Sequence, residues 1–166
     1  MLMTRCAKVA MTATLSLFAL LVAFNNVTDY GSNFAFVQHV LRMDTTFVDS
    51  AARWRAIGQP LVWHATYLLI IATEVLAGVL MALGAWAMWR ARHARMADFA
   101  RAKQWAVAGL LAGFVLWFAG FMVVGGEWFL MWQSHEWNGQ DSAARFYTAI
   151  LGVLIFVNQA DADLPA

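Results

Sequence analysis

The sequence predicts an all-α membrane protein: a four-transmembrane-helix bundle with short interfacial helices in the first extracytoplasmic loop. Hydrophobic residues make up 62% of the 166 residues and charged residues only 13%, far from the usual composition of a soluble domain. The chain also contains long apolar segments, such as Leu61 to Trp89, and about 20 apolar residues are enough to cross a bilayer as a helix. We therefore expect residues 1–166 to form a single membrane domain.

The first transmembrane helix is expected at about residues 7–24, where Arg5 and Lys8 precede an apolar run from Val9 to Phe24. Asn25 and Asn26 form a polar pair of the kind that ends a helix, so we expect the helix to stop there. No small-x-small cleavage site follows the run, which favours a retained membrane anchor over a cleaved secretory signal.

The outer loop, residues 31–60, is too long to be structureless in so small a protein. Apolar residues recur at helical spacing between Phe34 and Leu41, which predicts a short amphipathic helix lying at the membrane interface. A second helical pattern follows residues 49–50, whose side chains are suited to capping a helix, and Pro60 ends it. The loop should therefore carry one or two short helices.

The second and third transmembrane helices are expected at about residues 61–89 and 104–131, each with tryptophans near both ends, as at membrane interfaces. A fourth is expected at about 143–158. The loop after the second helix holds the densest basic cluster of the chain, and basic loops stay in the cytoplasm. Both termini should then be cytoplasmic as well. The cluster consists of Arg90, Arg92, Arg95, Arg101 and Lys103.

Several long runs of the chain resemble a known family. They are NNVTDYGSNFAFVQHVLRMDTTF (25–47), IIATEVL (70–76), GFMVVGGEWFLMWQS (120–134), WNGQ (137–140) and LIFVNQ (154–159). Together they are similar to the bacterial predicted small integral membrane proteins grouped as domain of unknown function 2165. The resemblance implies a small four-helix protein of a bacterial inner (plasma) membrane. It implies no activity and supplies no catalytic residues.

Glu74 is the sharpest functional candidate, because an ionisable side chain deep in a membrane is costly and often functional. One interpretation is a proton or cation site, with Thr73 or Tyr67 nearby on the same helix. The other, which we favour, is a packing acid that is hydrogen-bonded to a backbone carbonyl, an asparagine or a neighbouring subunit. In either case its partners should come from other helices.

Four further polar residues are expected on the outer side: His39, His64, Glu127 and His135. Imidazole binds zinc, copper and haem iron, so the histidines are candidate ligands if they converge. None of them has the local spacing of a metal motif, and a hydrogen-bonding surface role is the plainer interpretation. Since Cys6 is the only cysteine, a multi-cysteine metal site is excluded, and we expect no metal and no cofactor.

Two features of the third helix concern packing. Gly109 and Gly113 lie four residues apart, a spacing that lets another helix approach closely. Trp117 stands far from both interfaces and is suited to packing around a lipid or quinone tail.

The basic loop after the second helix should contact anionic lipid head groups.

The chain lacks a nucleophile elbow, a phosphate loop, a dinucleotide fingerprint and a paired-histidine protease helix, so we expect no enzyme activity. A net charge of +1 without a basic stripe gives no reason to expect nucleic acid as a partner. Our leading hypothesis is a non-catalytic membrane protein that forms a homo-oligomer or joins a larger membrane complex. The alternative is a small transporter or proton-linked channel with Glu74 as the coupling acid. A redox or lipid-binding subunit is a third hypothesis.

Overall fold

The structure is a computed structural model that describes residues 1–162, and this part of the chain consists of helices joined by turns and short loops. The elements follow the chain in the order α1 (Leu2–Thr28), α2 (Tyr30–Arg42), η1 (Arg53–Arg55), α3 (Pro60–Arg90), α4 (Met96–Ala102), α5 (Gln104–Phe114), η2 (Val115–Trp128), η3 (Met131–Gln133) and α6 (Gln140–Asn158).

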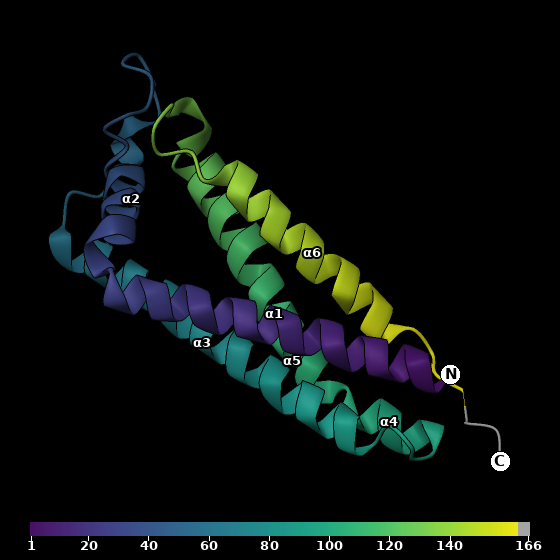
Figure 1. The fold of residues 1–166 in the computed structure, drawn as a ribbon. Coiled ribbons are helices and arrows are strands. Elements are labelled where there is room, and N and C mark those ends of the chain that lie inside the picture. The colour runs from purple at the N-terminus through teal and green to yellow at the C-terminus, as the bar shows by residue number, and fades with distance from the viewer. Residues whose placement is uncertain (163–166) are drawn as a thin grey trace.

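The long helices form two pairs that enclose a wedge (Figure 1). Helix α1 packs along α3, and α6 packs along α5 and η2. The pairs meet at the end of the molecule that carries the N-terminus and α4, and they diverge toward the other end, where α2 closes the wedge. The N-terminus, the C-terminal end of α6 and the connection between α3 and α5 therefore share one end of the bundle.

Glycines bring the two pairs together at the closed end of the wedge. A Cβ atom added to Gly84 on α3 would lie 2.2 Å from the backbone nitrogen of Ala106 on α5. One added to Gly109 would lie 2.6 Å from the backbone nitrogen of Met81. Backbone atoms cannot yield as a flexible side chain can, so these sites require glycine. Beyond this crossing α3 contacts η2 at few places, and the wedge opens.

The expectation that the first helix ends at Asn25 and Asn26 is wrong. Helix α1 continues to Thr28, and Asp29 separates it from α2. The Asn26 side chain does not cap the helix; it is buried and bonded to α2 and α3, so this polar pair belongs to the interior. The other helices expected near 61–89 and 143–158 are present as α3 and α6 with slightly wider bounds.

The segment expected as one helix over 104–131 changes its winding in the middle. It is α-helical as α5 and then π-helical as η2, with the wider i→i+5 bonding pattern that is rare and often found at functional sites. The amphipathic helix expected in the outer loop is α2, whereas the second helical pattern there forms only the short 3₁₀ turn η1.

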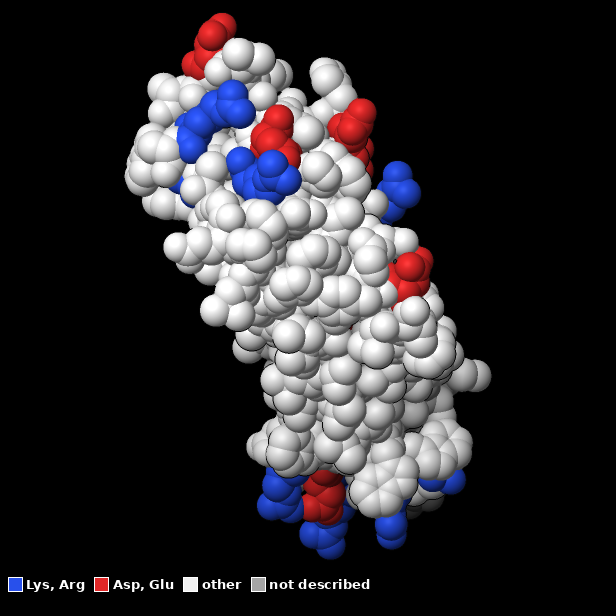
Figure 2. Space-filling model, turned by 90° about the vertical axis from the view of Figure 1, so that its left-hand side faces the viewer, with Lys and Arg blue, Asp and Glu red and all other residues white. Residues whose placement is uncertain are grey.

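The exterior is that of a membrane protein. Within residues 1–162, three helical stretches are long and apolar enough to span a bilayer: Leu2–Thr28, Pro60–Arg90 and Met96–Trp128. Figure 2 shows that charged side chains gather toward the two ends of the molecule, with a band of uncharged residues between them. Whether α6 is a fourth span, and whether α2 lies at an interface, stay predictions.

Candidate functional site

Glu74 lies inside the wedge and is bonded to another helix. Its side chain is 2% exposed, and its Oε2 atom accepts a hydrogen bond of 2.8 Å from the Asn26 amide of α1. The Asn26 Oδ1 atom accepts one of 2.7 Å from the Asn33 amide of α2. The Tyr67 hydroxyl donates to the Asn26 carbonyl oxygen at 3.1 Å. These bonds fix which end of the Asn26 amide faces the carboxyl group and join α1, α2 and α3.

The Glu74 carboxyl group is only partly satisfied by the protein. A carboxylate offers about four acceptor sites on two oxygens. The Oε1 atom accepts no hydrogen bond from the described residues, and Glu74 lines a cavity. The ion pairs found within residues 1–162 lie elsewhere, and none includes Glu74.

This cavity, which we call the polar hollow, has a volume of about 240 Å³ and lies between α1, α2, α3, η2 and α6. Its polar lining comes from Glu74, Asn26, Asn33 and Ser142. Aromatic side chains make up much of the remaining wall: Phe36, Tyr67, Trp117, Phe121 and Phe146. Trp117, expected from the sequence to pack around an apolar tail, is buried and packs edge-on against Phe146 at 5.7 Å between ring centroids.

A second cavity, which we call the apolar hollow, has a volume of about 380 Å³ and lies between α2, α3 and η2. Thr73 lines this cavity rather than the polar hollow, and its hydroxyl donates to the Leu69 carbonyl oxygen at 2.8 Å. Thr73 is therefore not a partner of Glu74. Both hollows share one wall, made by Phe36, Val37, Ile70 and Phe121.

The outer histidines have separate partners. His64 is hydrogen-bonded to the Tyr30 hydroxyl at 2.8 Å and stacks on Phe34 with 4.2 Å between ring centroids. His39 is bonded to Asp44 at 2.9 Å and stacks on Trp137 at 4.5 Å. Both histidines thus tie α2 to its surroundings.

The other two outer candidates, Glu127 and His135, are exposed. Within residues 1–162 no three side chains of His, Cys, Asp or Glu come close enough to hold a metal ion. The structure therefore does not bring the four outer candidates together.

The small-residue pair of the third helix packs inside the chain. Gly109 lies against the backbone of α3, as described above, and Gly113 lies against α6, where an added Cβ would be 3.2 Å from the Ile150 side chain. The face carrying both glycines is occupied by helices of the same chain.

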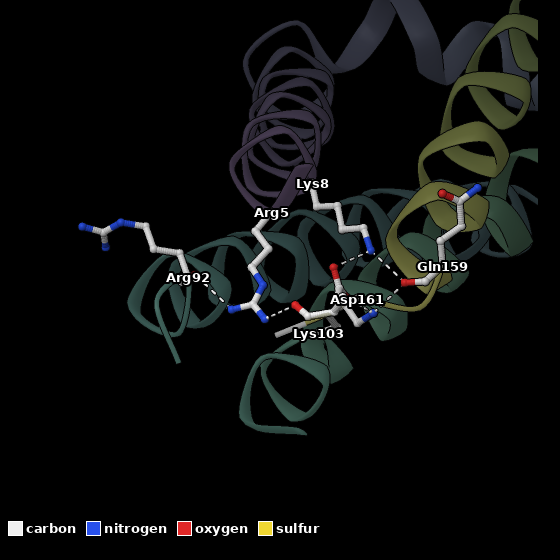
Figure 3. A network of polar contacts seen from close by, with 7 residues as sticks. Arg5, Lys8, Arg92, Lys103, Gln159 and Asp161 are labelled. Atoms are coloured by element: carbon white, nitrogen blue, oxygen red, sulfur yellow. Dashed lines mark hydrogen bonds and ion pairs between the residues drawn. The ribbon is translucent and has the colours of Figure 1, made fainter. Parts of the chain in front are cut away.

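Figure 3 shows a buried ionic network at the closed end of the wedge. Lys8 and Lys103 donate to the two carboxylate oxygens of Asp161 at 2.9 and 2.7 Å, and both donate to the Gln159 carbonyl oxygen. Arg5 donates to carbonyl oxygens of Arg92, Ala94 and Ala162. The segment after α6 is thereby bonded to α1, to Lys103 between α4 and α5 and, through Arg5, to the loop after α3.

The network contains three cations and one carboxylate, and Lys8 and Lys103 pair with the carboxylate directly. Carbonyl oxygens beyond the C-terminal ends of α3 and α6 supply further negative partial charge, which offsets part of the excess. Burial alone raises the pKa of Asp161, but the hydrogen bonds from Lys103 and Lys8 outweigh it and hold this pKa below its ordinary value. The sequence reasoning missed the network, although Arg5 and Lys8 are spaced to share a helix face.

The fold and the wedge define the class of protein: an all-helical integral membrane protein with a buried acid between its helices. The chain belongs to the family of predicted small integral membrane proteins named DUF2165, whose family model matches residues 4–160. No curated protein and no solved structure matches the chain.

Proposed function

We propose that this chain is a non-catalytic accessory protein of a bacterial inner membrane that holds a lipid-like molecule in its apolar hollow. The observation that carries the proposal is the hollow itself. Its volume of about 380 Å³ falls in the range of about 300–1,000 Å³ typical of ligand pockets.

The lining of the apolar hollow favours a hydrocarbon chain. Its walls are almost entirely apolar, and the hydroxyl of one of its few polar residues, Thr73, already donates within α3. Some of the lining side chains also belong to the outer surface: Leu69 is 67% exposed, Val115 49% and Val124 47%. The hollow is therefore open toward the side of the bundle, where lipid chains surround a membrane protein.

The test is retention of a bound lipid by the purified protein. Ala119 lines the apolar hollow, so Ala119→Trp should fill it and release the ligand. Ala82 is exposed on α3 and lines neither hollow, so Ala82→Trp is the matched control. Native mass spectrometry should detect a lipid-like adduct on the wild type and on Ala82→Trp but not on Ala119→Trp. An adduct retained equally by all three proteins, or absent from the wild type, would refute the proposal.

Assembly with a second copy or a larger complex remains part of the proposal, but it needs another surface. Gly109 and Gly113, which suggested it, contact α3 and α6 of the same chain. The mass of the particle in nanodiscs measures this directly, and a strict monomer without partners counts against it.

A proton-linked transporter is the second candidate, and one observation favours it. The hydrogen bonds from Asn33 through Asn26 link an exposed residue of α2 to the buried Glu74. Amide groups hold a carboxyl group well but pass protons poorly, because each amide would have to turn over after every transfer. We therefore rank this candidate second. It requires that Glu74→Gln abolish a flux in proteoliposomes while Glu127→Gln, the same change at an exposed acid, leaves the flux intact.

We also propose that α6 is the fourth span and that the closed end of the wedge faces the cytoplasm. The exposed arginines between α3 and α5 support this orientation. In a Cys6→Ala background, a membrane-impermeant thiol reagent applied from outside should label Ser50→Cys but not Arg95→Cys. The opposite labelling pattern would reverse the topology.

A further inference from the structure

We propose that the polar hollow binds an organic ammonium ion, with Glu74 as its counter-ion and the aromatic side chains as its walls. This site is separate from the apolar hollow and goes beyond the lipid-holding function. Three features of the polar hollow carry the inference: the unpaired carboxylate oxygen, the fixed amide beside it and the aromatic lining.

The first feature is an acid that lacks a counter-charge. A carboxylate removed from water is costly unless it is paired and hydrogen-bonded. The protein supplies Glu74 with one donor, the Asn26 amide at 2.8 Å, and no cation among the described residues pairs with it. Its Oε1 atom has no donor among the described residues, and Glu74 lines the hollow. A cation placed there would supply both the missing charge and the missing donor.

The second feature is that the acid is held in place in advance. Asn26 cannot turn its amide without losing the bond of 2.7 Å from Asn33, and Tyr67 donates to the carbonyl oxygen of the same residue. Oε2 is thus committed to the protein and Oε1 is left for a ligand. A site whose groups are already oriented loses less entropy when the ligand binds.

The third feature is the aromatic lining. Phe36, Tyr67, Trp117, Phe121 and Phe146 line the same hollow as the carboxyl group. Aromatic rings attract cations through their negative faces, and aromatic cages recognise quaternary ammonium groups. Apolar substituents on the nitrogen also suit such walls better than they suit water.

The same features disfavour a metal ion. Calcium and magnesium take at least six oxygen ligands, and transition metals favour several imidazole, thiolate or carboxylate ligands. The polar hollow offers one carboxylate, two amides, one serine hydroxyl and the Tyr67 hydroxyl, which already donates to Asn26. An alkylammonium ion needs only one counter-charge and an apolar surface, and this lining supplies both.

The experiment compares two molecules of one shape on the unmodified protein. Choline carries a trimethylammonium group, and 3,3-dimethylbutan-1-ol has the same outline with carbon in place of the charged nitrogen. Radiolabelled choline should bind saturably to the protein in an uncharged detergent. Unlabelled choline should displace it, and the uncharged alcohol should not. Absence of saturable binding, or equal displacement by the alcohol, overturns the inference without any substitution.

Variants then assign the binding to the polar hollow. Glu74→Gln keeps an acceptor for Asn26 but removes the charge, and it should weaken choline binding by about tenfold or more. Phe146→Leu keeps the hollow apolar but removes one ring, and it should weaken binding by about two- to thirtyfold. Glu127→Gln is the matched control at an exposed acid and should leave binding unchanged. If Glu74→Gln and Phe146→Leu unfold at the wild-type temperature yet bind as the wild type does, choline binds elsewhere and the assignment fails.

Discussion

Replacing Asp161 with asparagine should destabilise the protein by about 3 kcal/mol. The Asp161 side chain is 3% exposed and accepts from Lys8 and Lys103, whose side chains are 1% and 10% exposed. Breaking a buried ion pair by removing one partner costs about 3–5 kcal/mol. The lower end applies because both ammonium groups keep the Gln159 carbonyl oxygen, at 2.8 and 3.1 Å. Asparagine retains one acceptor oxygen but turns an amide donor toward a cation.

Reversible unfolding in mixed micelles of dodecyl maltoside and SDS measures this loss, with helicity as the signal. Asp98→Asn is the matched control, since Asp98 is 47% exposed and its partner Arg101 is 74% exposed. Such surface pairs contribute only about 0–1 kcal/mol. If Asp161→Asn costs no more than Asp98→Asn, the network does not stabilise the fold and the reasoning is refuted.

Acid should remove the same stabilisation. The pKa of Asp161 is lower in the folded protein than its ordinary value of about 3.9, because hydrogen bonds from Lys103 and Lys8 outweigh burial. A group whose pKa falls on folding contributes its full stabilisation above the unfolded value and loses it as the pH falls through the folded value. Unfolding of the wild type should therefore become easier below about pH 4, more steeply than unfolding of Asp161→Asn.

Two further substitutions test the closed end and the centre of the wedge by the same unfolding assay. Gly84→Ala should cost about 1–3 kcal/mol, because its Cβ would lie 2.2 Å from the α5 backbone. Gly152→Ala is the control: its Cβ would meet nothing within 4 Å, so the change should be neutral or stabilising. If Gly152→Ala destabilised the protein more than Gly84→Ala, the close contact of α3 and α5 at Gly84 would be contradicted. Asn26→Ala should cost about 1–3 kcal/mol, because it removes the donor that the buried Glu74 has among the described residues, whereas Glu74→Gln can still accept from Asn26 and should cost less.

The membrane character and most helix positions could be predicted from the sequence, because length and apolarity determine which segments can cross a bilayer. The family resemblance was confirmed over residues 4–160. Glu74 could also be singled out, since a lone acid in an apolar run is conspicuous. Its partner could not. Asn26 lies next to Asn25 at the end of an apolar run, and a pair of asparagines there indicates a helix end equally well.

The wedge could not be predicted from the sequence, because its shape depends on where α3 and α5 contact each other. Gly109 and Gly113 indicated a close approach but not the partner, and a helix of the same chain satisfies the pattern as well as a second subunit does. The ionic network pairs Asp161 with Lys8, which is 153 positions away in the sequence. No local sequence pattern encodes such a pairing. The change to π-helical winding at η2 has no sequence signal that we can identify.

The positions of these contacts explain why both hollows lie in one half of the molecule. Glycine contacts and the ionic network hold α1, α3, α5 and α6 together at the closed end. At the other end, α2 closes the space between the helix pairs, and the loop after α2 is hydrogen-bonded to Gln133 and Ser134. Phe36 and Val37, both on α2, line the polar hollow and the apolar hollow alike. Occupancy of either cavity therefore affects the same helix. The contacts that oppose displacement of α2 include the hydrogen bonds of Tyr30 with His64 and of Asn33 with Asn26. The stacking of His39 on Trp137 is another.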